Sequence, residues 1–139
     1  MTKEDVFSFV KENPVCFLAT VDGDAPRVRG MRMFGADVRG IMIQISTVKD
    51  VYKEIARNPK VELCFNDLTK GIQIRVRGKA EFLEEKSVKE EVLKARPFLK
   101  SLVDAHGLDA IKVFRVAEAT ASVWTMQTNL EPKPTIDLT

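Results

Sequence analysis

The stretch VCFLATVDGDAPRVRGMRMFGADVRGIMIQIS, residues 15–46, decides the fold of this chain. It contains three runs of strand length and composition, separated by turn signals at Asp22-Gly23-Asp24 and between Gly35 and Gly40. Glycine beside aspartate favours the tight turns that connect antiparallel strands. The stretch therefore predicts three consecutive strands joined by hairpins, a β-meander.

The second of these strands, APRVRGMRMF at residues 25–34, carries three arginines. Successive side chains of a strand point to opposite faces, so this strand mixes cations and apolar groups on both faces. One face carries Arg27, Arg29, Met31 and Met33, and the other carries Val28, Gly30, Arg32 and Phe34. Such a strand is either an exposed edge or one wall of a site that binds an anion.

Helical periodicity appears on both sides of the meander. Residues 2–13 predict a helix capped by Thr2, with Asp5 placed as in a capping box. Residues 47–59 predict a second helix, capped by Ser46 or Thr47.

Further strands are predicted over residues 60–66, 71–84 and 111–126, with two short helices meeting at Arg96-Pro97 in between. Gly78 within a strand indicates a bulge or a close backbone approach. These elements predict a mainly β fold, a six-stranded antiparallel barrel with peripheral helices. We expect one domain over residues 1–126 and a C-terminal tail, residues 127–139, whose two prolines argue against regular structure.

The composition excludes several classes of protein. With 22 Lys and Arg against 20 Asp and Glu, the net charge is +2, too small to drive strong binding to nucleic acid or anionic membranes. Cys16 and Cys64 lie in strand-like runs rather than in a metal-binding motif, so we expect reduced, buried cysteines and no metal. The N-terminus lacks a secretory segment and no apolar run is long enough to span a bilayer, which predicts a cytoplasmic protein.

The junction IQISTVKDV, residues 43–51, is a candidate anion site because a helix that starts after a strand presents unpaired N–H groups. Ser46 and Thr47 add hydroxyl donors, and Lys49 is a cation near the positive end of the helix dipole. Lys49 could equally belong to the solvated face of the helix. Either Arg27 or Arg29 could reach the same anion from the second strand.

Two residues of later strands are weaker candidates. Gln73 could contact the edge of a heteroaromatic ring, or could face solvent. Trp124, the only tryptophan, could stack on a ring or belong to the core or an interface.

The segments APRVRGMRMF, IQISTVKDVYKEIARNPKVELCF and IQIRVRGKAEFLE, in this order, resemble the FMN-binding split-barrel family related to pyridoxamine 5'-phosphate oxidase. The resemblance covers about residues 5–126. It implies a six-stranded antiparallel split barrel that forms a homodimer, with two FMN molecules at the subunit interface.

The resemblance also implies which residues bind FMN. Arg29 would hold the phosphate together with Lys49, with Arg27 as the alternative. The flavin and ribityl chain would be lined by Gly30, Met31, Arg32, Met33, Ile45 and Ser46. Gln73 would contact the flavin, and Trp124 of a partner subunit would approach the ring.

Two departures from the family limit the predicted activity. The tail TNLEPKPTIDLT lacks the Arg and His that grip the substrate phosphate in true pyridoxamine phosphate oxidases, and Phe34 stands where those enzymes carry a lysine. We therefore expect an FMN-dependent oxidoreductase that acts on a different small molecule, with no catalytic residue identified. The alternatives are a haem- or deazaflavin-binding split barrel, a small RNA-binding β-barrel, or a structural dimer without a ligand.

Overall fold

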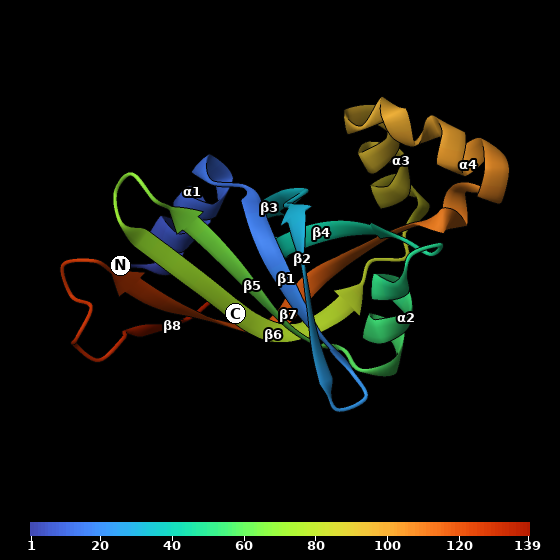
Figure 1. Cartoon of the computed structure of the whole chain (residues 1–139). Helices are drawn as coiled ribbons and strands as arrows, with labels where there is room; N and C mark the ends of the chain where they lie inside the picture. Colours follow the sequence, from blue (N-terminus) through green and yellow to red (C-terminus); the bar gives the residue numbers. More distant parts are fainter.

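The computed structural model describes residues 1–139 and consists of one sheet with helices at its periphery (Figure 1). The helices are α1 (Lys3–Glu12), α2 (Asp50–Arg57), α3 (Lys86–Ala95) and α4 (Lys100–His106), with 3-10 turns η1 (Pro97–Leu99) and η2 (Leu108–Ala110). The strands are β1 (Val15–Asp22), β2 (Ala25–Arg32), β3 (Gly35–Asp37), β4 (Gly40–Ser46), β5 (Lys60–Asp67), β6 (Ile72–Phe82), β7 (Ile111–Thr125) and β8 (Thr135–Asp137). None of the helices is long and apolar enough to cross a membrane.

The predicted fold class is confirmed. All six long strands form, antiparallel throughout, in the order β2-β1-β5-β6-β7-β4. Two strands of three residues were not predicted: β3 pairs with β4, and β8 pairs with β7. The expectation of an irregular tail is therefore wrong at residues 135–137, where Pro134 lies just before β8 and leaves its ladder intact.

The predicted meander is wrong at one connection. β2 follows β1 in a hairpin with Ala25 opposite Asp22, but β2 does not pair with β4. β4 instead pairs with β7, so β2 and β3 end the strand order and the sheet remains open between them. The turn signal between Gly35 and Gly40 is real, but it connects β4 to the short β3 rather than to β2.

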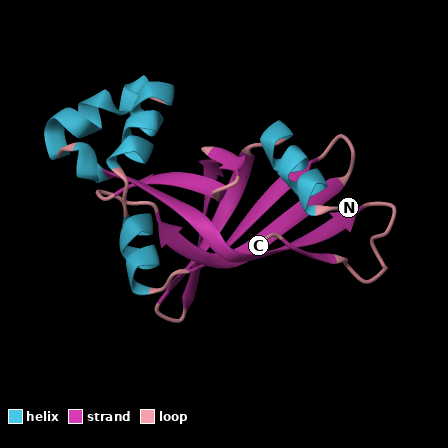
Figure 2. Ribbon diagram, turned by 180° about the vertical axis from the view of Figure 1, so that it is seen from behind, coloured by secondary structure: helices cyan, strands magenta, loops and turns pink.

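The helices close the ends and edges of this sheet (Figure 2). α1 begins with the predicted capping box, in which Thr2 and Asp5 exchange hydrogen bonds, and buries Val6 and Val10 in the main core. α2 packs its buried Val51 and Ile55 on the same core. α3, η1 and α4, which we call the α3–α4 hairpin, cover a second, smaller apolar cluster.

Gly78 occupies the bulge that its position in the sequence predicts. The register between β6 and β7 shifts between Arg77 and Lys79, and a Cβ at residue 78 would lie 2.4 Å from the carbonyl oxygen of Ala117. On the facing strand, Glu118 adopts a left-handed backbone with φ of 52°. Only glycine fits this close approach of the two strands.

Candidate functional site

A cleft of about 410 Å³ opens where β2 and β4 fail to pair. We call it the β2–β4 cleft. The ends of β2 and β4 form two of its walls, the start of α2 forms the third, and the α3–α4 hairpin forms the fourth. Its apolar lining includes Met31 of β2, Ile45 of β4 and Val51 of α2, together with Phe98, Leu99 and Leu102 of the hairpin.

The charge of this cleft has one sign. Arg32, Lys49 and Arg96 line it, and no aspartate or glutamate does. None of the three cations forms a salt bridge elsewhere in the protein. An apolar cleft with three unneutralised cations is suited to a ligand with an anionic group and an apolar body.

Arg96 connects the α3–α4 hairpin to both sides of the open sheet. Its Nη1 donates to Oε1 of Gln44 at 3.0 Å, and its Nη2 donates to the carbonyl oxygens of Arg32 and Met33 at 3.0 and 3.3 Å. The guanidinium also lies 5.5 Å from the centre of the Phe34 ring. Burial, and secondly the neighbouring positive charge of Arg32, lower the pKa of Arg96. Every acceptor around this guanidinium is uncharged, so its positive charge is not neutralised.

Lys49 lines the cleft and occupies the N-cap position of α2. The predicted caps are wrong because the chain makes an extra turn after β4: Ser46 Oγ accepts from the Val48 amide at 3.3 Å, and the Thr47 amide donates to Ala110. The helix therefore begins at Asp50 without a side-chain cap. The first amides of a helix lack intrahelical acceptors, so Lys49 and the start of α2 form a site with donors and positive charge.

Arg29 points away from the cleft, into the barrel. Its Nη2 donates to Oε1 of Glu54 at 2.5 Å, and its Nη1 donates to Oγ1 of Thr20 and the carbonyl of Leu18 at 2.8 and 3.2 Å. Thr20 donates in turn to the same Glu54 oxygen. Glu54 and Thr20 are both buried, so this group holds α2 against β1 and β2. The alternative, Arg27, is exposed and pairs with Asp22 at 3.2 Å.

Gln73 and Trp124 do not line the cleft. They are cross-strand partners at the start of β6 and the end of β7. The amide of Gln73 donates to Asn66 at 2.9 Å, and the indole of Trp124 donates to Asn129 at 2.7 Å.

The cleft thus gathers Gly30, Met31, Arg32, Ile45, Ser46 and Lys49 from the residues predicted for the site, and leaves out Arg29, Met33, Thr47, Gln73 and Trp124. Met33 is buried in the main core, although its carbonyl accepts from Arg96. The predicted FMN contacts of all these residues stay predictions. The sequence analysis missed the hairpin residues, because their only local signal, the Arg96-Pro97 break, indicates a helix end and not what that end contacts.

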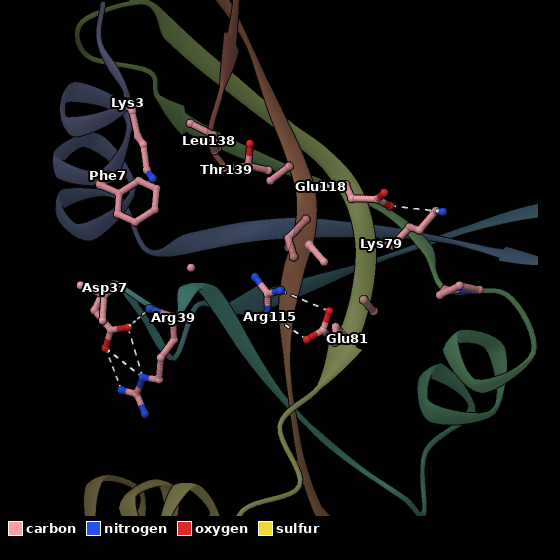
Figure 3. A pocket seen from close by; sticks show the side chains of 17 residues that line it. Lys3, Phe7, Asp37, Arg39, Lys79, Glu81, Arg115, Glu118, Leu138 and Thr139 are labelled. Carbon is pink, nitrogen blue, oxygen red and sulfur yellow. Dashed lines mark hydrogen bonds and ion pairs between the residues drawn. The ribbon is translucent and has the colours of Figure 1, made fainter.

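A larger cavity, of about 670 Å³, lies between α1, the start of β4 and the bulge of β6 and β7, and shares no residue with the cleft (Figure 3). We call it the α1–β7 cavity. Its guanidinium groups face carboxylates: Arg39 pairs with Asp37 at 2.7 Å and Arg115 with Glu81 at 3.2 Å. Lys79 pairs with Glu118 at 3.2 Å. Because these charges compensate each other, this cavity is less suited to an anionic ligand despite its size.

Comparison with known proteins agrees with this architecture. The family model described as Pyridoxamine 5'-phosphate oxidase matches residues 2–126. No curated protein sequence matches the chain significantly.

Three solved structures illustrate the likeness in fold. A NimC/NimA family protein from Clostridium acetobutylicum is 28% identical, with a TM-score of 0.76 over 96% of this chain and 91% of the other. PhzG from Burkholderia lata 383, solved with tetrahydrophenazine-1-carboxylic acid, is 14% identical, with a TM-score of 0.74 over 97% and 89%. An FAD-binding protein from Mesorhizobium loti is 15% identical, with a TM-score of 0.64 over 90% and 96%.

Proposed function

Because the chain belongs to the pyridoxamine 5'-phosphate oxidase family, we propose that it binds FMN in the β2–β4 cleft and acts as a flavin-dependent oxidoreductase on a small molecule. The observation that carries this proposal is the charge of the cleft, which has three cations and no carboxylate. A flavin nucleotide has the matching chemistry, an anionic phosphate and a large apolar ring system.

The residues of the cleft fit the two ends of FMN. Lys49 and the first amides of α2 would hold the phosphate through charge-assisted hydrogen bonds. Met31, Ile45 and Val51 would cover the apolar part of the cofactor and keep water away from it. The resemblance also assigns the phosphate to Arg29, but a phosphate would have to compete for it with the buried carboxylate of Glu54.

The bound flavin would supply the redox chemistry by accepting and releasing a hydride. The chain's own contribution is to bind and orient the cofactor, since no side chain of the cleft is an evident general base. We favour FMN over FAD because the segments quoted in the sequence analysis resemble a family that binds FMN.

We further propose that the working form is a homodimer. Val15, Phe17 and Val28 form an exposed apolar strip on the outer face of β1 and β2, with exposed fractions of 60%, 52% and 69%. In the β1–β2 register, Val15 lies opposite Arg32 and Phe17 opposite Gly30, so the strip borders the cleft. A second copy seated on this strip would bury it, and could bring Gln73 and Trp124 to the other subunit's flavin.

A visible spectrum and an FMN titration test this proposal. The purified protein is expected to be yellow, or to take up added FMN stoichiometrically with quenching of its fluorescence. Reduced nicotinamides and small-molecule acceptors would then identify the reaction. A protein that binds neither FMN nor FAD would refute the proposal, and a haem spectrum would favour the haem-binding alternative.

A further inference from the structure

A largely buried polar group connects two walls of the β2–β4 cleft. It consists of Thr20 of β1, Arg29 of β2 and Glu54 of α2, and we call it the Thr20–Arg29–Glu54 clamp. Oε1 of Glu54 accepts one hydrogen bond from Thr20 Oγ1 at 2.7 Å and another from Arg29 Nη2 at 2.5 Å. Thr20 Oγ1 also accepts from Arg29 Nη1 at 2.8 Å, so each member of the clamp contacts both others.

The clamp joins two segments that no strand pairing joins. β2 pairs only with β1, whereas β4, which leads into α2, pairs with β3 and β7. The end of β2 and the start of α2 are both walls of the cleft, and no backbone ladder fixes the distance between them. The bond between Arg29 of β2 and Glu54 of α2 crosses this opening through side chains instead.

The other buried contacts of α2 are apolar and less directional. Val51 and Ile55 pack on the main core, and apolar contacts tolerate small rotations of a helix better than hydrogen bonds of fixed geometry do. The start of α2 has no side-chain cap, so its direction depends on contacts further along the helix. Glu54 lies five residues after Lys49, about 7.5 Å along the helix axis. A small rotation of α2 would therefore move Lys49 and the first amides of the helix relative to β2.

Stability alone does not account for a polar clamp at this place. Glu54 is 8% exposed and Thr20 is 3% exposed, so both have lost hydration. The attraction between a buried carboxylate and a guanidinium roughly offsets that loss, and apolar residues of the same size are often at least as stabilising. A directional role, which fixes α2 relative to β2, accounts for polar residues at all three positions.

We propose that Thr20 and Glu54 are positioning residues of the flavin site. Through Arg29 they set the spacing between β2 and the start of α2, and so make the cleft selective for a flavin that carries a phosphate. This inference rests on the proposed function, in which Lys49 and the first amides of α2 hold the phosphate. Neither Thr20 nor Glu54 lines the cleft, so both act through the position of Lys49.

Binding of FMN and of riboflavin, the same molecule without the phosphate, separates positioning from general structural support. Fluorescence titration gives both dissociation constants, and the ratio of the riboflavin constant to the FMN constant measures the contribution of the phosphate. Thr20→Val keeps the shape of the side chain but removes the hydroxyl group that bonds both Arg29 and Glu54. We expect it to lower this ratio about five-fold, as the loss of one hydrogen bond would, with riboflavin affinity unchanged within about two-fold.

Two further variants make the test specific. Thr20→Ser keeps a hydroxyl group and is expected to restore the ratio of the wild-type protein. Ile74→Val shortens a buried core residue of β6 that belongs neither to the clamp nor to the cleft, so it should lower stability and leave the ratio unchanged. The phosphorus NMR resonance of bound FMN is a second readout, which Thr20→Val should shift and Ile74→Val should not.

The remaining outcomes distinguish this inference from the proposed function. If Thr20→Val weakens FMN and riboflavin equally, or changes neither, the clamp is a structural element only, and the inference falls while the proposed function stands. If Thr20→Val raises FMN affinity, the clamp withholds Arg29 from the phosphate, and the inference falls in the same way. If the wild-type protein binds riboflavin as tightly as FMN, the start of α2 does not hold the phosphate and the inference falls. If it binds no flavin, both fall together.

Discussion

The β2–β4 cleft and the α1–β7 cavity differ in how their charges are arranged. The cavity is larger, about 670 Å³ against 410 Å³, yet its Arg39, Lys79 and Arg115 all face carboxylates. The cleft carries cations alone. An anion entering the cavity would have to break existing ion pairs, whereas one entering the cleft would gain hydrogen bonds that the protein leaves unmade. Charge compensation therefore distinguishes these sites better than volume does.

Arg29 offers the strongest test of this difference. It lies on β2, a wall of the cleft, but its charge is neutralised by Glu54, as the charges of the cavity arginines are neutralised by carboxylates. Arg29→Ala leaves the carboxylate of Glu54 buried without its partner, so the free energy of unfolding should fall by about 3 kcal/mol. Urea denaturation measures this loss, and the double variant Arg29→Ala/Glu54→Ala should recover part of it. FMN affinity should change less than in Lys49→Ala. A larger loss of affinity would assign Arg29 to the phosphate.

Arg96 of the cleft and Arg39 of the cavity allow the same substitution to be compared in the two sites. Arg96→Ala removes three hydrogen bonds that join the hairpin to β2 and β4, and should lower the free energy of unfolding by about 2 kcal/mol. Arg39→Ala removes ion pairs with half-exposed carboxylates and should lower it by less than about 1 kcal/mol. Equal losses in denaturant titrations would contradict the contrast between the two sites.

Substitutions of Lys49 in the cleft and of Lys79 in the cavity test which of the two sites binds FMN. Lys49→Ala should raise the dissociation constant of FMN about ten-fold, equivalent to about 1.4 kcal/mol, because one charge-assisted contact is lost. Lys79→Ala, in the α1–β7 cavity, should leave it unchanged. Fluorescence quenching of FMN measures both, and the effect of Lys49→Ala should shrink at high salt. If both substitutions weaken FMN binding to the same extent, the cofactor does not bind in the β2–β4 cleft.

The smallest expected effect concerns pH and belongs to the cavity. Hydrogen bonds from Arg39 lower the pKa of Asp37 and of Glu91 below their ordinary values of 3.8 and 4.5. A carboxyl with a lowered pKa in the folded state contributes stability above its unfolded pKa and loses it as the pH falls through the folded value. The difference in stability between wild type and Arg39→Gln should therefore be present at pH 7 and shrink as the pH falls below the ordinary pKa values of the two carboxyls. Arg96→Lys, which involves no carboxylate, should show a constant difference over this range.

Much of the fold could be predicted because its signals are local. The capping box of Thr2, the break at Arg96-Pro97 and the bulge at Gly78 each follow from a few neighbouring residues, and the structure confirms all three. The alternation of Arg29 and Arg32 onto opposite faces of β2 is also as predicted: Arg29 points into the barrel and Arg32 outward.

The failures concern contacts between distant segments. The order of the strands in the chain predicts that β2 and β4 are neighbours, but β4 pairs with β7, whose residues lie about 70 positions later, and no local pattern indicates this pairing. Glu54 lies 25 residues after Arg29, and no local pattern indicates that they meet. Arg96 likewise reaches Gln44 from 52 residues away. The wall of the cleft that carries Arg96 and Phe98 could not have been found before the fold was known.

The short strand β8 has a consequence for the solubility of the protein. β4 covers β7 only at residues 111–115, and β8 pairs with Thr120–Ser122 beyond it. Leu138, buried next to β8, fastens the chain end to the main core. Without these last residues, a stretch of apolar strand would present open N–H and C=O groups, which recruit other strands and start aggregation. Strand β8 and Leu138 thus protect this edge of β7 from pairing with strands of other molecules. A protein shortened to residue 133 should therefore aggregate, and scatter light, at a lower temperature than the intact protein.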